Sequence, residues 1–379
     1  MNKEIEFCVV LPCLNEEGTI GNCIKKIKEV FAKESIQGEI IVADNGSTDR
    51  SREIALAEGA KVVIEPQPGY GAAYLRGLKE ATGRYIVIGD SDDTYDFYDI
   101  AKFLQPLREG YDFVIGSRFM GKIQKNSMPW LNRYLGNPLL SGMCRLFFRT
   151  RLSDIHCGMR AFTQEAYQKM KLMTLGMEFA TEMVVAALQN HLRIYEIPIH
   201  YYPRKGKSKL NPLNDAWRHI RFMLLYCPLW LYFIPGVAGF VLGSSILLLL
   251  LKGPFPFLGH NWDLHPMIFA SVISIFSYQV INLGTFAHIF AIRQGFLRAD
   301  KLTALLQRHF NLERGLLLGG FLILIGIAIT AFIVVDWFSR GFGALYRIRE
   351  SILAMTLLVI GLQTIFSSFF LSLLFLERK

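Results

Sequence analysis

The first half of the chain alternates between short, continuous apolar runs and stretches in which apolar residues recur at helical spacing. The runs predict buried strands and the stretches predict helices. Strands and helices that alternate at this spacing predict a largely parallel sheet with helices on both faces. The expected strands are 5–11, 39–43, 61–64, 85–89 and 112–117, and the expected helices are 19–33, 48–59 and 70–82.

The last third of the chain is mostly apolar. From Cys227 onward it holds 11 Lys and Arg and 6 Asp and Glu, out of 41 and 32 in the whole chain. We therefore expect an α/β domain over 1–210, an amphipathic juxtamembrane segment over 211–228 and an all-α transmembrane bundle over 229–379. Segments of about 20 apolar residues suffice to cross a bilayer. Four such segments are expected, at about 229–251, 266–292, 315–335 and 352–375.

The stretch 127–151 mixes apolar side chains, such as Trp130 and Leu135, with four arginines that include Arg133 and Arg145. This mixture fits an interfacial helix on a membrane surface. A helix that faces the core of the α/β domain is the alternative. The sequence leaves both open.

The charge pattern predicts an orientation. The net charge is +9, and no zinc finger, RNA-recognition signature or basic helix accompanies it, so we expect no nucleic acid partner. The connector 293–314 holds five basic residues and the connector 252–265 holds one, which places the α/β domain and both termini in the cytosol. Arg340, Arg347 and Arg349 count against this unless they lie in an interfacial segment. The six cysteines show no disulfide or metal spacing.

Polar clusters follow three of the expected strands: Asn15 and Glu16, then 44–47 (DNGS), then 90–93 (DSDD). Ligands of parallel sheets bind at the carboxyl ends of the strands. Asp90 and Asp92 can aim two carboxylates at a Mg²⁺ or Mn²⁺ that bridges a diphosphate. Asp44 can accept a hydrogen bond from a base or, alternatively, take part in a helix cap. Gly71 lies in a turn whose N–H groups can face a phosphate.

Several motifs together resemble family 2 glycosyltransferases with a GT-A fold. They are 11–16 (LPCLNE), 43–49 (ADNGSTD), 69–73 (GYGAA) and 90–92 (DSD). Further on, 116–119 (GSRF), 132–133 (NR), 154–162 (DIHCGMRAF) and 208–210 (SKL) are similar to the polyprenyl-phosphate hexose synthase branch, which includes dolichyl-phosphate mannose synthase. The resemblance covers about residues 5–215.

The resemblance implies a role for each matched residue. Pro12, Asn15, Glu16, Asp44 and Gly71 would hold the nucleotide, and Asp90 and Asp92 would hold the metal and diphosphate. Arg118 and Arg133 would meet the acceptor phosphate, and Arg204, Ser208 and Lys209 would cover the phosphates from a basic loop. The family pattern often has Gln two residues after the second Asp. Thr94 stands there in this sequence, so the third metal ligand is open between Asp93 and Thr94.

The resemblance implies a hexose transfer from a nucleotide sugar to undecaprenyl or dolichyl phosphate, with inversion and without a strong general base. A family 2 transferase that acts on a hydroxyl is the second hypothesis, although the Gln-x-x-Arg-Trp motif of processive enzymes is absent. A non-catalytic membrane partner in lipid-linked sugar export is the third. Glu178 is a base or a structural partner of an arginine, Glu182 has no assigned role, and His156 is expected to be a structural loop residue. Homo-oligomers through the membrane helices are compatible with the resemblance.

Overall fold

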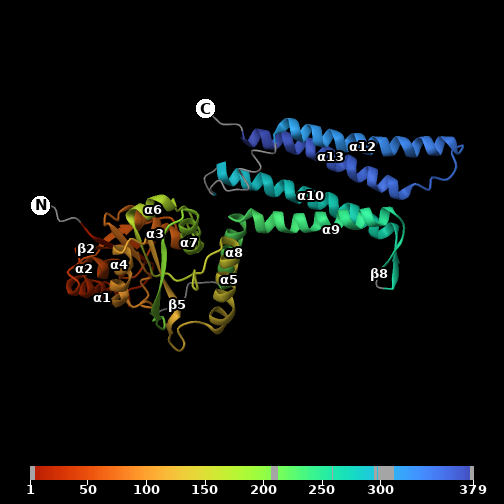
Figure 1. Cartoon of the computed structure of the whole chain (residues 1–379). Coiled ribbons are helices and arrows are strands. Elements are labelled where there is room, and N and C mark those ends of the chain that lie inside the picture. Colours follow the sequence, from red (N-terminus) through yellow and green to blue (C-terminus); the bar gives the residue numbers. More distant parts are fainter. Residues whose placement is uncertain (1–4, 206–211, 258, 294–296, 298–310, 376–379) are drawn as a thin grey trace. The chain divides into compact units, whose positions relative to one another are not determined.

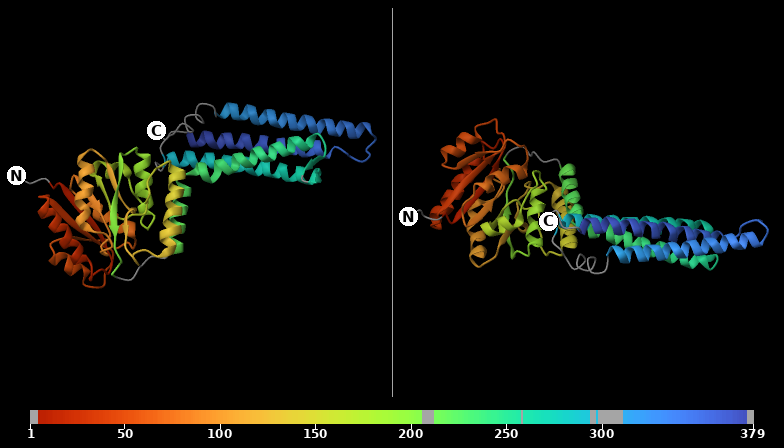
Figure 2. Two further views of the ribbon diagram at one scale, coloured as in Figure 1. Left: turned by 60° about the horizontal axis from the view of Figure 1, so that its bottom comes forward. Right: turned by 90° about the horizontal axis from the view of Figure 1, so that it is seen from above.

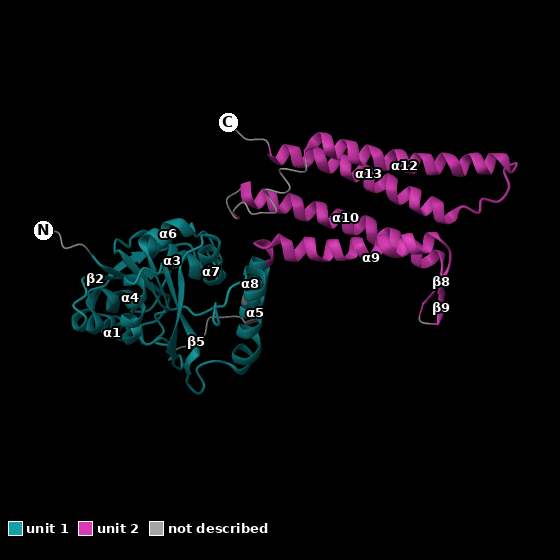
Figure 3. Ribbon diagram, viewed as in Figure 1, with its two compact units in different colours: residues 1–223 teal, residues 224–379 magenta. Residues whose placement is uncertain are grey.

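The computed structural model describes residues 5–205, 212–257, 259–293, 297 and 311–375. It divides into two compact units, Met1–Met223 and Leu224–Lys379 (Figure 3). The first unit holds the sheet and the helices that cover it, and the second consists mainly of long helices (Figure 1).

The first unit is built on a seven-stranded sheet with the order β3-β2-β1-β4-β6-β5-β7. β6 runs antiparallel to its neighbours β4 and β5, and the other pairs in the sheet are parallel, which confirms the expected mostly parallel sheet. The strands are β1 (Phe7–Cys13), β2 (Gly38–Asp44), β3 (Lys61–Ile64), β4 (Tyr85–Ile88), β5 (Phe113–Ile123), β6 (Arg160–Thr163) and β7 (Ile194–Tyr201).

Helices cover both faces of this sheet (Figure 2). α1 contacts both α2 and α4, while α3 contacts α7 and lies on β1 and β2. A Cβ atom at Gly77 of α3 would lie 2.4 Å from Val10 of β1, so only glycine allows this close approach. The helices are α1 (Ile20–Lys33), α2 (Ser51–Ala57), α3 (Tyr70–Lys79), η1 (Phe97–Asp99), α4 (Ile100–Arg108), α6 (Gln164–Met170) and α7 (Phe179–Gln189).

The carboxyl ends of β1, β2 and β4 meet at one edge of the sheet, since Cys13 pairs with Asp44 and Val10 with Ile88. The polar clusters that follow these strands therefore touch. The Thr48 N–H donates to Asn15 Oδ1 at 2.8 Å, and the Ser91 hydroxyl donates to the Pro12 carbonyl oxygen at 2.6 Å.

The stretch 127–151 forms a π-helical turn, η2 (Asn132–Gly136), that leads into α5 (Asn137–Phe148). One side of α5 packs on the core, where Leu140, Ser141 and Cys144 are buried. The exposed residues of the stretch are mostly apolar with arginines such as Arg145 among them, so it combines features of both sequence interpretations. Its exposed apolar residues are Trp130, Leu131, Tyr134, Leu135, Leu139 and Leu146, which we call the apolar surface of η2–α5.

Most of α8 (Pro212–Leu225) belongs to the first unit. His219 and Met223 are buried, and the Thr181 hydroxyl of α7 lies 2.7 Å from His219 Nδ1. The compact first unit thus reaches Met223, and α8 meets α7 through His219.

In the described part of the second unit, four helical segments are long and apolar enough to cross a membrane. The four apolar segments expected from the sequence lie within them. The first joins η3 (Leu229–Phe233) to α9 (Ile234–Leu251), and the others are α10 (Leu264–Arg293), α12 (Leu312–Ser339) and α13 (Ile348–Phe375). A short hairpin of β8 (Phe255–Phe257) and β9 (His260–Trp262) lies between α9 and α10.

Small residues and hydroxyl pairs join these helices, as is common between membrane helices. A Cβ atom at Gly319 of α12 would lie 2.7 Å from the Gly361 carbonyl oxygen of α13. Ser271 pairs with Thr356 at 2.6 Å, and α10 therefore contacts α13 through polar as well as apolar atoms.

The arginines at the end of α12 and the start of α13 have carboxylate partners. Arg340 and Arg347 pair with Asp336 at 3.2 and 3.3 Å, and Arg349 pairs with Asp263. Each of these three charges is thus paired within the protein.

Candidate active site

Asp90 and Asp92 follow β4 at the carboxyl edge of the sheet. Asp90 Oδ1 accepts hydrogen bonds from the hydroxyls of Tyr70 at 2.9 Å and Tyr74 at 3.3 Å. Asp92 Oδ1 accepts from the N–H and the hydroxyl of Thr94 at 3.1 and 2.6 Å. Each carboxylate therefore keeps its Oδ2 atom outside these contacts.

The electrostatics of this pair suit a divalent cation. Burial raises the pKa of Asp90 to about 6, and the charge of Asp92 adds to the rise. The described residues contain no group of three His, Cys, Asp or Glu side chains that could hold a metal ion. Two neighbouring carboxylates are hard oxygen ligands of the kind that Mg²⁺ and Mn²⁺ prefer, and metal binding by this pair stays a prediction.

Both candidates for a third metal ligand are engaged within the protein. The Thr94 hydroxyl donates to Asp92 and is buried. Asp93 accepts hydrogen bonds from Asn22 at 2.9 Å, Lys26 at 2.8 Å and Lys205 at 2.5 Å.

Arg204 joins two of the predicted site residues. Its guanidinium lies 2.8 Å from Glu16 Oε1 and 3.4 Å from Asp92 Oδ2. Glu16 is itself buried, and the Thr19 hydroxyl donates to its Oε2 at 3.3 Å. The structure thus brings together a cationic side chain and the two acidic clusters after β1 and β4. Ser208 and Lys209 of the same predicted loop lie outside the described residues.

Asp44 is fully buried in the turn after β2. Its carboxylate accepts hydrogen bonds from the N–H groups of Gly46 at 3.1 Å and Ser47 at 3.3 Å, and Arg52 pairs with it at 2.6 Å. Asp44 thus closes the turn that follows β2 and does not cap α2, whose N-cap residue is Arg50, while its contact with a nucleobase stays a prediction.

The turn before α3 is fixed on both sides. The Gly69 N–H donates to Asn45 Oδ1 at 2.8 Å, and the Ala72 N–H donates to the Leu175 carbonyl oxygen at 3.1 Å. A Cβ atom at Gly71 would lie 2.2 Å from the Thr174 carbonyl oxygen, so no side chain fits there. Two N–H groups of this region are therefore used inside the protein, and phosphate binding at Gly71 stays a prediction.

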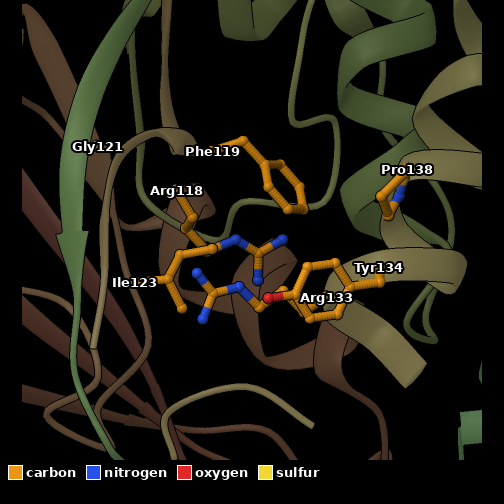
Figure 4. Close-up of a pocket in the computed structure, with 7 residues that line it drawn as sticks. All are labelled: Arg118, Phe119, Gly121, Ile123, Arg133, Tyr134 and Pro138. Atoms are coloured by element: carbon orange, nitrogen blue, oxygen red, sulfur yellow. The ribbon is translucent and has the colours of Figure 1, made fainter. Parts of the chain in front are cut away.

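Arg118 and Arg133 line one pocket of about 320 Å³ together with Phe119, Gly121, Ile123, Tyr134 and Pro138. Their side chains reach into the same space beside the rings of Phe119 and Tyr134 (Figure 4). Arg118 is buried, and two of its nitrogens donate to Asp154 at 2.6 and 2.8 Å. Burial lowers the pKa of Arg118, but the Asp154 carboxylate outweighs this and raises it well above its usual value.

Arg133 differs from Arg118 because it has no carboxylate partner among the described residues. Its guanidinium lies 5.4 Å from the centre of the Tyr134 ring, which belongs to the apolar surface of η2–α5. The pocket therefore offers a cation for an anion beside exposed apolar side chains.

The residues around α7 are mainly structural. Glu182 accepts hydrogen bonds from the N–H groups of Met173 and Thr174, both at 2.9 Å. Glu178 differs, because its Oε2 is buried without a hydrogen-bond partner in the described structure. His156 Nε2 lies 3.5 Å from the Thr181 hydroxyl, and burial lowers the pKa of His156 well below its usual value. A neutral, packed His156 agrees with a structural role.

Sequence reasoning missed several partners of the site. Tyr70 and Tyr74 are one helical turn apart at the start of α3, and this spacing after the Gly-rich turn is the signal that could have indicated them. Asp154 lies in the 154–162 motif, which gives no indication that it pairs with Arg118. Lys26 and Lys205 gave no local signal for their contact with Asp93, because they are distant in sequence.

Comparison with known proteins agrees with this geometry. The family model "Glycosyl transferase family 2" matches residues 8–171, and "Glycosyltransferase family 2 C-terminal transmembrane region" matches residues 285–375. A low-salt glycan biosynthesis hexosyltransferase, Agl6, of Haloferax volcanii is 39% identical over 367 residues, which cover 96% of this chain and 87% of that protein. A dolichyl-phosphate hexose transferase of the same organism is 31% identical over 207 residues, 55% of this chain and 87% of that protein.

The fold of the first unit also occurs among solved structures. The crystal structure of a mycobacterial protein has a TM-score of 0.50 and 23% identity, and the match covers 59% of this chain and 74% of that one. The sheet with its polar carboxyl edge, the apolar helices and the long match to Agl6 lead to one conclusion. The chain belongs to glycosyltransferase family 2 and is a glycosyltransferase with a GT-A domain followed by helices apolar enough to span a membrane.

Proposed function

We propose that this enzyme transfers a hexose from a UDP- or GDP-linked sugar to a polyprenyl phosphate at the cytosolic face of a membrane. The observation that carries the proposal is the pocket of Arg118 and Arg133, which adjoins the apolar surface of η2–α5. A lipid phosphate has the matching parts, an anionic head and an apolar chain. The names of the two Haloferax relatives support a hexose donor and this acceptor class.

The donor would bind at the carboxyl edge of the sheet, with Pro12, Asn15, Glu16, Asp44 and Gly71 around the nucleotide. Mg²⁺ or Mn²⁺ held by Asp90 and Asp92 would neutralise the charge that develops on the leaving diphosphate. Arg204 would add positive charge at the same place, since it already lies beside Asp92 and Glu16.

The acceptor phosphate is an anion at neutral pH, so it needs positioning more than a base. Arg133 would bind its oxygens in bidentate fashion, and Arg118, fixed by Asp154, would orient it. One phosphate oxygen then forms a bond to the anomeric carbon as the bond from that carbon to the diphosphate breaks. Displacement in line inverts the anomeric configuration.

Two features support the membrane setting. The exposed apolar surface of η2–α5 would rest on the lipid, where the acceptor's chain lies. The basic connector after α10 favours cytosolic termini and a cytosolic GT-A domain. The ion pairs of Arg340, Arg347 and Arg349 would then lie at the opposite interface.

The test is sugar transfer by the full chain in detergent with undecaprenyl or dolichyl phosphate, Mg²⁺ or Mn²⁺ and a panel of labelled nucleotide sugars. We expect an acid-labile labelled lipid that disappears with Asp92→Ala and falls strongly with Arg133→Gln. Arg108→Gln, a surface arginine paired with Glu6, is the matched control. Transfer only to a hydroxyl acceptor would contradict the proposal.

One observation favours the hydroxyl-directed alternative. Glu178 has a buried carboxylate oxygen without a partner in the described structure, as a general base would need before its substrate binds. If Glu178→Gln abolishes transfer to every acceptor while nucleotide binding persists, the alternative gains support. Retained transfer to lipid phosphate in this variant would exclude Glu178 as a required base.

A further inference from the structure

We propose that Asp93 is a positioning residue that holds the segment 202–205 on the donor site, and that it is not a metal ligand. The proposal rests on the proposed function only in assuming that a nucleoside diphosphate binds beside Asp92. It concerns how Arg204 is kept in place.

Asp93 directs its carboxylate to α1 and to Lys205. Oδ1 pairs with Lys26 at 2.8 Å, and Oδ2 accepts from Asn22 at 2.9 Å and from Lys205 at 2.5 Å. The side chain is only 4% exposed. Three donors on two oxygens leave little capacity for a metal ion.

The backbone of Asp93 is also unusual. Its φ of 60° lies in the left-handed region, which costs free energy for a residue with a side chain. The polar contacts of the carboxylate are the visible compensation for this strain. Asn22 and Lys26 lie one helical turn apart on α1, so they present their donors from one face of a rigid element.

The segment 202–205 is attached to the 93–94 turn at two points. The Tyr202 N–H donates to the Thr94 carbonyl oxygen at 2.9 Å, and Lys205 pairs with Asp93. Arg204 lies between these attachments, and its guanidinium reaches Glu16 and Asp92. The turn after the Asp90–Asp92 pair therefore fixes the cation that is expected to face the diphosphate.

A positioning role for Asp93 and a simple effect of its charge predict opposite changes in nucleotide affinity when Asp93 is neutralised. Asp93→Asn frees the charges of Lys26 and Lys205, and added positive charge by itself would tighten the binding of a diphosphate. Loss of the attachment would instead let Arg204 leave its place, and binding would weaken. Weaker nucleotide binding by Asp93→Asn would thus indicate positioning, and tighter binding would indicate a simple charge effect.

The experiment uses the full chain in detergent and compares Asp93→Asn, Lys205→Met and the double variant. Calorimetry measures the binding of UDP and GDP with saturating Mn²⁺, and of Mn²⁺ alone. We expect each single variant to weaken binding of the preferred nucleotide by about tenfold. The double variant should bind the nucleotide no more weakly than either single variant, because all three variants lose the same Asp93–Lys205 pair. Affinity for Mn²⁺ alone should not fall in Asp93→Asn, because Asp93 is not a ligand and an Arg204 that leaves Asp92 no longer competes with the cation.

Asp112→Asn and Lys61→Met are the matched controls. Asp112 accepts a hydrogen bond from the Arg193 N–H, and Lys61 pairs with Glu80. Asp112 and Lys61 both lie at the amino ends of their strands, so neither substitution should alter nucleotide binding. If Asp93→Asn does not fold, Lys205→Met tests the same pair, because the Lys205 side chain is 59% exposed.

Three results would overturn the proposal. They are tighter nucleotide binding by Asp93→Asn, additive effects in the double variant, and a loss of Mn²⁺ affinity in Asp93→Asn that Lys205→Met does not share. A wild type that binds nucleotide but transfers no sugar to lipid phosphate would contradict the proposed function alone. The effect of Asp93 on nucleotide binding would still decide this inference.

Discussion

The guanidinium of Arg204 lies 3.4 Å from the carboxylate of Asp92, on the oxygen that Thr94 leaves unused. It thus neutralises one of the two carboxylates that a divalent cation would bind. Arg204 has two effects of opposite sign. It competes with a free cation for Asp92, and it attracts the diphosphate that arrives with the cation.

We therefore expect Arg204→Gln to bind Mn²⁺ alone more tightly, by about tenfold, while sugar transfer falls. The physical reason is that the variant removes a positive charge from the carboxylates and also from the diphosphate. Titration with Mn²⁺ in the absence of nucleotide measures the first effect, and kcat/KM for the donor measures the second. Weaker Mn²⁺ binding together with unchanged sugar transfer would contradict both expected effects of Arg204.

The two arginines of the pocket should respond differently to substitution. Asp154→Asn leaves the buried Arg118 without its counter-charge, and breaking such a buried pair costs about 3–5 kcal/mol. Arg133 has no carboxylate partner in the described structure, so Arg133→Gln should leave stability nearly unchanged.

Thermal unfolding of the full chain in detergent measures this difference, and acceptor KM measures the functional loss in Arg133→Gln. Arg108→Gln serves as the surface control. A melting temperature that falls as far in Arg133→Gln as in Asp154→Asn would show that Arg133 is mainly structural.

The sequence was sufficient for the strands that are continuous apolar runs and for the polar clusters behind them. It was not sufficient for β6 and β7. β6 is four residues long and contains Arg160, whose buried guanidinium donates to three carbonyl oxygens, including those of Cys157 and Ala180. β7 alternates in burial and contains Pro198, which an edge strand tolerates. Tertiary contacts define β6, and Pro198 interrupts the alternation that would otherwise indicate β7.

For the site, the sequence identified single residues and their order but not their partners. Asp90 and Asp92 stand out because they follow a buried strand. Arg118 pairs with Asp154, which is 36 positions away in the sequence. Asp93 pairs with Lys205, which is 112 positions away. Such pairings follow from the strand order, which local periodicity does not contain.

The raised pKa of Asp90 predicts that kcat/KM falls at low pH, which gives the pH profile an acid limb. Burial and then the charge of Asp92 raise this pKa to about 6, so Asp90 is ionised above that pH and protonated below it. A cation needs the ionised form, so kcat/KM for the donor should fall by up to about tenfold per pH unit below 6.

The charge of Arg204 lowers the pKa of Asp90, so Arg204→Gln should move this limb to higher pH. The profile is measured from pH 5 to 8 with saturating lipid acceptor and with Mn²⁺ below saturation, because a saturating cation would keep Asp90 ionised. A flat profile in the wild type, or a limb that moves to lower pH in Arg204→Gln, would show that another group controls the acid side.

The apolar surface of η2–α5 should matter only when the acceptor is in a membrane. Leu135 is 54% exposed on this surface, and a charge there opposes burial in the lipid. Burying a leucine side chain contributes about 1.5–3 kcal/mol, so Leu135→Glu should raise the KM for a long-chain polyprenyl phosphate in vesicles by about tenfold or more. The KM for a short-chain, water-soluble lipid phosphate should stay the same as in the wild type. Leu56→Glu on α2, where the side chain is 60% exposed, is the matched control and should change neither KM. Equal loss with both acceptors would instead mean that Leu135 supports the pocket of Arg118 and Arg133, because a change in membrane contact cannot affect an acceptor dissolved in water.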